Sequence, residues 1–233
     1  MSVRSVQQRT FRDVQAQQTG AQPRRAKLQA QRSESGGVTD LSLKRLFDIT
    51  ISLLVIPILL PALLVIAALI KADSRGPVLF RQVRHGRNQK TFVILKFRTM
   101  TAHPSSEGRE ATRDDRRVTR VGRVLRKCSL DEVPQIFNVL RGDMSLVGPR
   151  PHPLWKDEVF FDLIRGYGDR YRVKPGITGL AQISGCRGET QTTTDMRRRI
   201  EKDLEYVEKQ SLALDLKILL LTVPSLLRLR DAY

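Results

Sequence analysis

An adjacent acidic pair, Asp131 and Glu132, is the clearest candidate for chemistry in this sequence. The pair lies in segment 126–151, which also carries Arg126 and Arg150. An ionised carboxylate beside guanidinium groups can act as a nucleophile or a metal ligand next to a bound phosphate, because each arginine offers phosphate oxygens two parallel donors. Acidic residues in a first helical turn are also ordinary helix caps. The pair alone therefore does not distinguish a chemical role from a capping role.

The residues that follow predict a short helix with one apolar face. Its apolar positions follow the i, i+3, i+4, i+7 spacing of a helix: Val133, Ile136, Phe137 and Leu140. Gly142, just after Arg141, predicts the carboxyl end of this helix. Ser129 and Glu132 fit a capping box, whereas Pro134 favours a start nearer the acidic pair. With either start, both carboxylates lie at the positive end of the helix dipole, which favours their ionised form.

The composition indicates an anionic partner. Lys and Arg number 41 against 24 Asp and Glu, which gives a formal net charge of +17. Nucleic acid, anionic lipid headgroups and a phosphorylated substrate all fit such a charge. Aromatic residues are only 6% of the chain, which argues against stacking platforms for nucleic acid. The two cysteines, Cys128 and Cys186, form no disulfide framework or zinc spacing, so the globular part is expected in a reducing cytoplasmic setting.

The amino-terminal part predicts a tail followed by a membrane helix. Residues 1–40 are rich in Gln, Arg, Ser and Gly, and we expect a disordered basic tail there. Residues 49–70 contain no charge and are long enough to cross a bilayer. However, Pro57 and Pro61 interrupt this run, and basic residues flank it on both sides, so both ends are expected on the cytoplasmic face. A Pro-broken re-entrant helix over 41–72 satisfies both observations; a kinked spanning helix is the alternative.

The rest of the chain predicts a mostly helical folded domain over 73–211, within an α+β fold. Two β-rich runs, 78–80 and 91–95, are separated by a turn-forming segment and predict a small hairpin. Residues 196–209 form a charged helical pattern with an apolar stripe. Residues 212–233 begin with an apolar run that charges and Pro224 interrupt, which predicts an interfacial amphipathic helix. A core helix of a soluble domain is the competing interpretation of this last segment.

Several strings of this sequence resemble the bacterial sugar transferase family, the monotopic polyprenyl-phosphate phosphoglycosyl transferases. The resemblance runs from about Lys44 to the carboxyl terminus. Its landmarks are KRLFD, GPVLFRQVRHG, KFRTM, SLDEVPQIFNVLRGDMSLVGPRP, KPGITGLAQISG and DLEYV. One departure is Leu60-Pro61, which stands where the family commonly has Ser-Pro at the helix break.

The resemblance implies transfer of a sugar 1-phosphate from a UDP-sugar to undecaprenyl phosphate, with release of UMP. It implies a covalent phospho-sugar intermediate on Asp131, with Glu132 as its partner and both carboxylates as ligands of Mg²⁺. It further implies substrate-binding roles for these residues: Lys96, Arg98, Arg126, Arg150 and Asp203. The expected location is the bacterial inner membrane, with the catalytic domain on the cytoplasmic face and anionic lipids as partners.

The identity of the sugar is predicted from one further string and one residue. The string GLAQISGCRGET and His152 after GPRP are similar to glucose-1-phosphate transferases of exopolysaccharide pathways, and galactose is the alternative. Two interpretations from other classes are a basic nucleic-acid-binding protein and a membrane scaffold without catalysis. We expect no nucleic acid partner, and self-association is left open.

Overall fold

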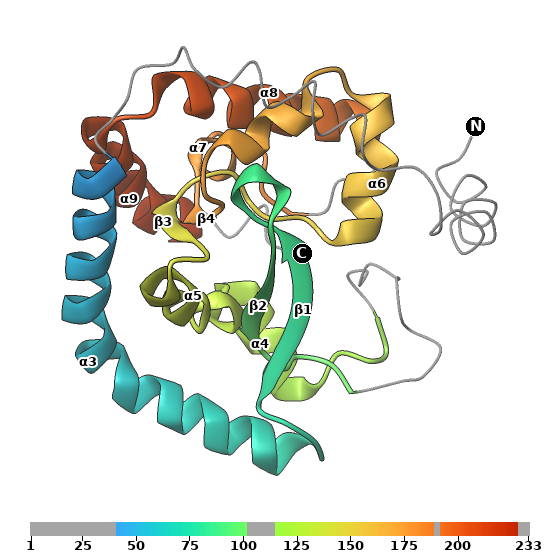
Figure 1. Cartoon of the computed structure of the whole chain (residues 1–233). Coiled ribbons are helices and arrows are strands. Elements are labelled where there is room, and N and C mark those ends of the chain that lie inside the picture. Colours follow the sequence, from blue (N-terminus) through green and yellow to red (C-terminus); the bar gives the residue numbers. More distant parts are fainter. Residues whose placement is uncertain (1–40, 102–114, 189–191, 228–233) are drawn as a thin grey trace.

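The protein has a mixed α+β fold built around two very small sheets (Figure 1). A computed structural model describes residues 41–101, 115–188 and 192–227. The expected basic tail 1–40 and the last residues, 228–233, lie outside this range, as do loop residues 102–114. The described elements are α3 Leu41–Asp73, β1 Leu79–His85, η1 Arg87–Gln89, β2 Thr91–Phe97, α4 Arg120–Cys128, η3 Leu130–Glu132, α5 Gln135–Arg141, β3 Ser145–Val147, α6 Leu154–Leu163, η4 Tyr167–Arg172, β4 Gly176–Thr178, α7 Leu180–Ile183, α8 Thr193–Lys209 and α9 Leu212–Leu227.

The predicted hairpin is confirmed. Strands β1 and β2 pair antiparallel from Leu79 opposite Phe97 to His85 opposite Thr91. The connection passes through Asn88, whose φ of 54° is a left-handed conformation that asparagine tolerates better than most residues. The inner face of β2 is apolar, and Ile94 is only 1% exposed. The hairpin therefore has one face packed on the core, which fixes its register.

The second sheet was not predicted. Strands β3 and β4 are three residues each and pair in parallel, with Val147 opposite Thr178. At this crossing Gly148 and Gly176 lie so close that a Cβ on Gly176 would stand 2.0 Å from the Gly148 nitrogen. Glycine is required here because no side chain fits between the two backbones. The pairing fixes where the chain leaves β3 toward Arg150.

The segment around the acidic pair differs from the predicted capped helix. Ser129 has a left-handed conformation (φ 55°) that ends α4, and it caps no following helix. A 3₁₀ turn, η3, carries Asp131 and Glu132, and α5 begins only after Pro134. The predicted end at Gly142 is confirmed by its φ of 95°.

The predicted apolar face of α5 is only partly buried. Ile136 is 5% exposed, but Phe137 is 39% exposed. Val139 and Asn138 are fully buried instead. Asn138 donates to the carbonyl of Val93 (2.7 Å) and accepts from the amide of Leu95 (3.0 Å), so its burial ties α5 to β2.

The core joins β2, β3, α8 and α9. Its buried members are Ile94, Val139, Met144, Leu146, Val147, Tyr206 and Ile218. The predicted charged helix is confirmed as α8, which begins with a capping box between Thr192 and Asp195. Helix α9 packs one side on this core through Ile218, which is fully buried, while Leu220 on its other side is 67% exposed.

Helix α3 is long, apolar and largely uncovered by the rest of the protein. Among the helices in the described ranges, its stretch Ser42–Asp73 alone has the length and apolar composition needed to cross a membrane. Pro57 and Pro61 both lie inside the helix, and the ribbon in Figure 1 bends between its blue and cyan halves. The side chain of Ile58, beside these prolines, is 76% exposed.

Both ends of α3 are attached to the folded domain. Near the start, Asp48 accepts hydrogen bonds from the Ser145 hydroxyl (3.0 Å) and the Leu146 amide (3.1 Å). Lys44 is buried there and forms an ion pair with Asp215 of α9. Near the end, the side chain of Ile70 is buried in a cluster with β2 and α4.

Candidate active site

Glu132 is held from two sides by cations. Its carboxylate accepts hydrogen bonds from Arg150 Nη1 at 2.6 Å and from Lys96 Nζ at 2.7 Å. Arg150 Nη2 makes a second contact, so the Arg150–Glu132 pair is bidentate. Burial would raise the pKa of Glu132, but Arg150 and Lys96 outweigh it and hold that pKa well below its usual range. Glu132 is therefore ionised and immobilised.

Asp131, unlike Glu132, is not held by a neighbouring side chain. It forms no hydrogen bond or ion pair with other residues in the part of the chain that the structure describes. Burial, together with the neighbouring Glu132 charge, raises the pKa of Asp131 to about 6, against the opposing effect of Lys96 and Arg150. At neutral pH Asp131 is thus mostly ionised, without a strong partner, and available as a nucleophile or a ligand.

Three separate elements bring these residues together. Lys96 lies on β2, the acidic pair on η3, and Arg150 just after β3. The turn at Ser129 directs the chain from α4 into η3, and the guanidinium of Arg187 contacts the Ser129 hydroxyl. A left-handed non-glycine residue costs free energy unless its surroundings hold it, and the Arg187 contact is one such restraint.

Two other predicted site residues have different placements. Arg126 lies close enough that its charge lowers the pKa of Asp131, and its Nη1 lies 3.7 Å from Met100 Sδ. Arg98 points instead to the carboxyl end of α3, where its Nη2 donates to the Ser74 carbonyl (2.6 Å) and hydroxyl (2.9 Å). The structure therefore groups Arg126 with the acidic pair and uses Arg98 to join β2 to α3.

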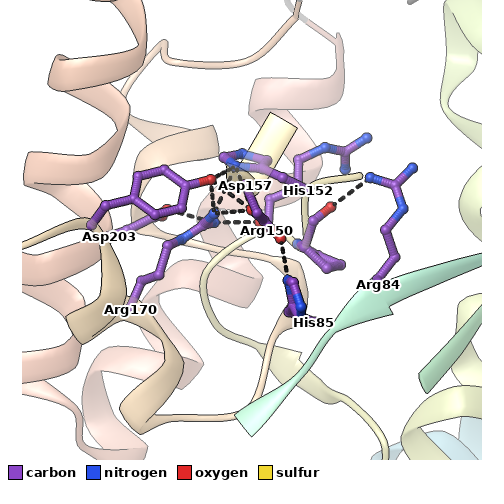
Figure 2. A network of polar contacts seen from close by, with 9 residues as sticks. Arg84, His85, Arg150, His152, Asp157, Arg170 and Asp203 are labelled. Carbon is purple, nitrogen blue, oxygen red and sulfur yellow. Dashed lines mark hydrogen bonds and ion pairs between the residues drawn. The ribbon is translucent and has the colours of Figure 1, made fainter. Parts of the chain in front are cut away.

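Asp203 lies in a separate buried network behind Arg150 (Figure 2). Its carboxylate is 2% exposed and pairs with Arg170 Nη2 at 3.0 Å. The same guanidinium donates to the backbone carbonyl of Arg150 and, through Nη1, to His152 Nδ1 at 2.6 Å. Asp203 thus reaches the acidic pair only through Arg170 and Arg150.

The remaining members of this network were not predicted as site residues. The Tyr167 hydroxyl donates to Asp157 Oδ1 at 2.7 Å, and Asp157 Oδ2 lies 2.8 Å from His85 Nδ1 on β1. Burial, reinforced by the Arg170 charge, lowers the pKa of His152 well below its usual range, so the ring is neutral. In the sequence, Arg170 stands in a run with Asp169 and Arg172, which is typical of an exposed turn and hides its burial.

The carboxylates are compatible with a divalent cation shared with a ligand. Within the described ranges, no group of three or more His, Cys, Asp or Glu side chains gathers as a closed metal site. Mg²⁺ commonly takes one or two carboxylates and completes its octahedron with water and substrate phosphates. Asp131, with its free oxygens, fits that pattern, whereas Glu132 has both oxygens engaged by Arg150 and Lys96.

Comparison with known proteins matches residues 39–229 to the family described as bacterial sugar transferase. The chain is 54% identical over 181 residues to a UDP-glucose:undecaprenyl-phosphate glucose-1-phosphate transferase of Klebsiella pneumoniae, covering 77% of this chain and 39% of that protein. A protein of the same name from Caulobacter vibrioides is 51% identical over 193 residues, covering 82% of this chain and 72% of that protein. A third, from Escherichia coli, is 49% identical over 182 residues, covering 78% and 39%. The chain thus spans about two fifths of the length of the first and third relatives.

Proposed function

The chain belongs to the bacterial sugar transferase family, and we propose that it transfers glucose 1-phosphate from UDP-glucose to undecaprenyl phosphate with release of UMP. Three relatives near 50% identity carry that activity in their names. A similar protein of Rhizobium leguminosarum, 44% identical over 191 residues, is named as an exopolysaccharide production protein. We assign this chain to the first membrane step of exopolysaccharide assembly.

The observation that carries the proposal is the unequal environment of the two carboxylates. Glu132 is fixed by Arg150 and Lys96, whereas Asp131 beside it has no hydrogen-bond partner in the described chain. A carboxylate that served only as a helix cap would accept backbone N–H groups, whereas Glu132 accepts from Arg150 and Lys96, and neither η3 nor the following α5 has a side-chain cap. The arrangement fits Asp131 as a nucleophile beside two cations, Arg150 and Lys96, whose positions are fixed by Glu132.

In the first step, an Asp131 oxygen attacks the phosphorus atom that carries the sugar. The bond between this phosphorus and the bridging oxygen of the diphosphate breaks, and UMP leaves with the electron pair. In the second step, a phosphate oxygen of undecaprenyl phosphate attacks the same phosphorus and releases the Asp131 carboxylate. The products are UMP and undecaprenyl diphospho-glucose, and no proton is consumed overall.

The cationic residues have distinct tasks in this scheme. The side chain of Arg150 is 32% exposed, so its guanidinium can meet a substrate phosphate while it still contacts Glu132. Lys96 is a more buried point charge on the other side of Glu132, at 18% exposure. Arg126 adds a third cation near Asp131. Together they offset the charge that develops on the phosphoryl oxygens.

A divalent cation, Mg²⁺ by family resemblance, would be held by Asp131 together with substrate phosphate oxygens. When bound, it would supply further charge neutralisation to the diphosphate. Glu132 would join as a ligand only where Arg150 or Lys96 releases one of its oxygens. Arg98 is proposed to act at α3 rather than on substrate phosphates, because its side chain is buried and its Nη2 donates to Ile70 and Ser74 at the end of α3. Asp203 is assigned to the support of Arg150 through Arg170.

The membrane arrangement is proposed as re-entrant. The start of α3 is tied to β3 through Asp48, and its end is packed against β2 and α4 through Ile70. Since both ends attach to one folded domain, both are expected on the same side of the bilayer. The exposed apolar middle of α3, around Ile58, would enter the membrane from the cytoplasmic face of the inner membrane. The exposed apolar side of α9, including Leu220, would lie at the interface.

The test is a turnover assay with purified protein in detergent or nanodiscs. UDP-glucose, undecaprenyl phosphate and Mg²⁺ are expected to give UMP and a lipid-linked glucose, and omission of the lipid is expected to stop turnover. UDP-galactose in a parallel arm decides the sugar. Folded protein that releases no UMP from any UDP-sugar tried, with lipid present, would contradict the proposed reaction.

A further inference from the structure

Arg170 is the most heavily engaged residue of the buried network behind the acidic pair. Its side chain is 2% exposed, yet it meets the Arg150 carbonyl, His152 Nδ1 at 2.6 Å and Asp203 at 3.0 Å. The Tyr167 hydroxyl lies a further 3.2 Å from its Nη1. Burying a guanidinium costs free energy of desolvation, which hydrogen bonds and an opposite charge must offset. The acceptors around Arg170 supply that compensation and fix the direction of its donors.

The contact with Arg150 is to its main-chain carbonyl and does not involve the Arg150 guanidinium. That guanidinium makes the bidentate contact with Glu132. On the next residue, the Pro151 carbonyl accepts a hydrogen bond from Arg84 Nη1 at 3.2 Å. Two successive carbonyls are therefore held by arginines from β1 and η4, which lie on opposite sides of Arg150 in the view of Figure 2.

The segment that these contacts hold has little regular structure of its own. Strand β3 ends at Val147, and α6 begins at Leu154. Between them, the backbone bonds near Arg150 join Gly148 to Thr178 and Gly176 to Pro149. Without Arg170, the Arg150 carbonyl would lose the contact that fixes it toward η4.

We propose that Arg170 is a positioning residue: it fixes the main chain at Arg150 so that the Arg150 guanidinium meets both Glu132 and a substrate phosphate. This rests on the proposed phosphoryl transfer at Asp131. The side chain of Arg170 is 2% exposed and makes its contacts with Arg150, His152, Tyr167 and Asp203 rather than with the acidic pair, so it acts through Arg150. Asp203 balances the charge of Arg170 and keeps its Nη2 directed at the Arg150 carbonyl.

The competing explanation is purely structural: Arg170 would exist only to neutralise Asp203 inside the fold. The two explanations differ in what a charge-balanced double variant does. Removing Arg170 alone leaves a buried, unpaired carboxylate and destabilises the protein under either explanation. Arg170→Met combined with Asp203→Asn removes both charges of the 3.0 Å pair, while the Arg150 carbonyl stays unheld. Asp157, whose Oδ1 lies 3.9 Å from Arg170 Nη1, keeps its contacts with the Tyr167 hydroxyl and His85 in this variant.

The experiment compares this double variant with Arg170→Lys and with Arg172→Met. Arg172 lies in the same 3₁₀ segment and is exposed, and its side chain has no hydrogen-bond or ion-pair partner in the described chain, so Arg172→Met is the matched control. The readouts are melting temperature, kcat and KM for UMP release, and UDP affinity by calorimetry. The last readout needs no turnover.

We expect the double variant to melt within a few degrees of the wild type while kcat falls about a hundredfold, with a smaller change in KM. Its affinity for UDP should fall about tenfold, because a misplaced Arg150 grips phosphate less well. Arg170→Lys keeps Asp203 paired and should fall between wild type and double variant in kcat. Arg172→Met should match the wild type in every readout.

Wild-type kcat and UDP affinity in a folded double variant would overturn the positioning role. If the double variant does not fold, wild-type kcat and UDP affinity in Arg170→Lys would overturn it in the same way. Absence of turnover in the wild type would instead contradict the proposed function. In that case the UDP affinities of wild type and variants still decide the positioning role.

Discussion

The acid limb of the pH–rate profile should report the ionisation of Asp131. Burial and the Glu132 charge raise the pKa of Asp131 to about 6, and the attacking form is the carboxylate. About nine tenths of Asp131 is then ionised at pH 7 and about one tenth at pH 5. We therefore expect kcat/KM for UMP release to rise roughly tenfold between pH 5 and pH 7, with a midpoint near 6.

Two substitutions should move this limb in opposite directions. Glu132→Gln removes the negative neighbour that raises the pKa of Asp131, so the limb should move to lower pH. Lys96→Met removes a cation that lowers the same pKa, so the limb should move to higher pH. Both variants are expected to have a lower maximum kcat/KM, because both residues belong to the site. The pH midpoint of the acid limb does not depend on that maximum.

The assay follows UMP release over pH 4.5 to 8.5, with the Mg²⁺ concentration constant and UDP-glucose well below KM. Circular dichroism at each pH checks that the variants remain folded. A limb at the same position in both variants, or a shift of both in one direction, would refute the assignment of this limb to Asp131.

Three further predictions follow from the contacts. Lys44→Met leaves Asp215 as a buried unpaired charge and should cost about 3–5 kcal/mol, a fall in melting temperature of roughly 10 °C, whereas exposed Lys71→Met should change little. Gly176→Ala places a Cβ 2.0 Å from the Gly148 nitrogen and should cost about 1–3 kcal/mol or more, measured by thermal unfolding beside Ser184→Ala at an exposed site. Cysteines introduced at positions 43 and 72, at the two ends of α3, should both react with an impermeant thiol reagent added from the cytoplasmic side, and labelling of one end only from that side would contradict a re-entrant α3.

Local sequence patterns were sufficient for the elements whose signals are short-range. The hairpin follows from two β-rich runs around a turn, and α8 follows from its 3.6-residue periodicity. The parallel pair of β3 and β4 was missed because each strand is only three residues long and its partner lies some thirty residues away. Pairing at that range depends on tertiary contacts that a periodicity analysis does not contain.

The predicted start of α5 was also wrong, because a second local signal overlapped with it. Ser129 and Glu132 match a capping box, but Ser129 instead ends α4 in a left-handed conformation. Ser129 carries both a signal for the end of α4 and a signal for the start of the next helix. The end of α4 determines its backbone conformation. The result is that the acidic pair sits in a 3₁₀ turn, which leaves Asp131 unbonded and lets Glu132 face Arg150 and Lys96.

The sequence pointed to the charged residues around the acidic pair, but not to the buried residues that hold them in place. Lys96 and Arg150 both pair with Glu132 in the structure, and the roles that the resemblance implies for these residues stay predictions. Arg98 and Arg170 are both arginines in basic stretches, and the sequence alone does not tell a guanidinium that meets substrate from one that is buried against carbonyls. Burial and hydrogen-bond geometry separate them: Arg98 joins β2 to α3, and Arg170 holds Arg150.

The most direct test of the account is whether Asp131 carries the phospho-sugar. Protein incubated with UDP-glucose and Mg²⁺, without lipid acceptor, is digested after acid quench and its peptides are analysed by mass spectrometry. The account predicts about one equivalent of UMP per protein and a hexose-phosphate adduct on the peptide that contains Asp131, both lost in Asp131→Asn. An adduct on another residue, or wild-type UMP release by Asp131→Asn, would contradict it.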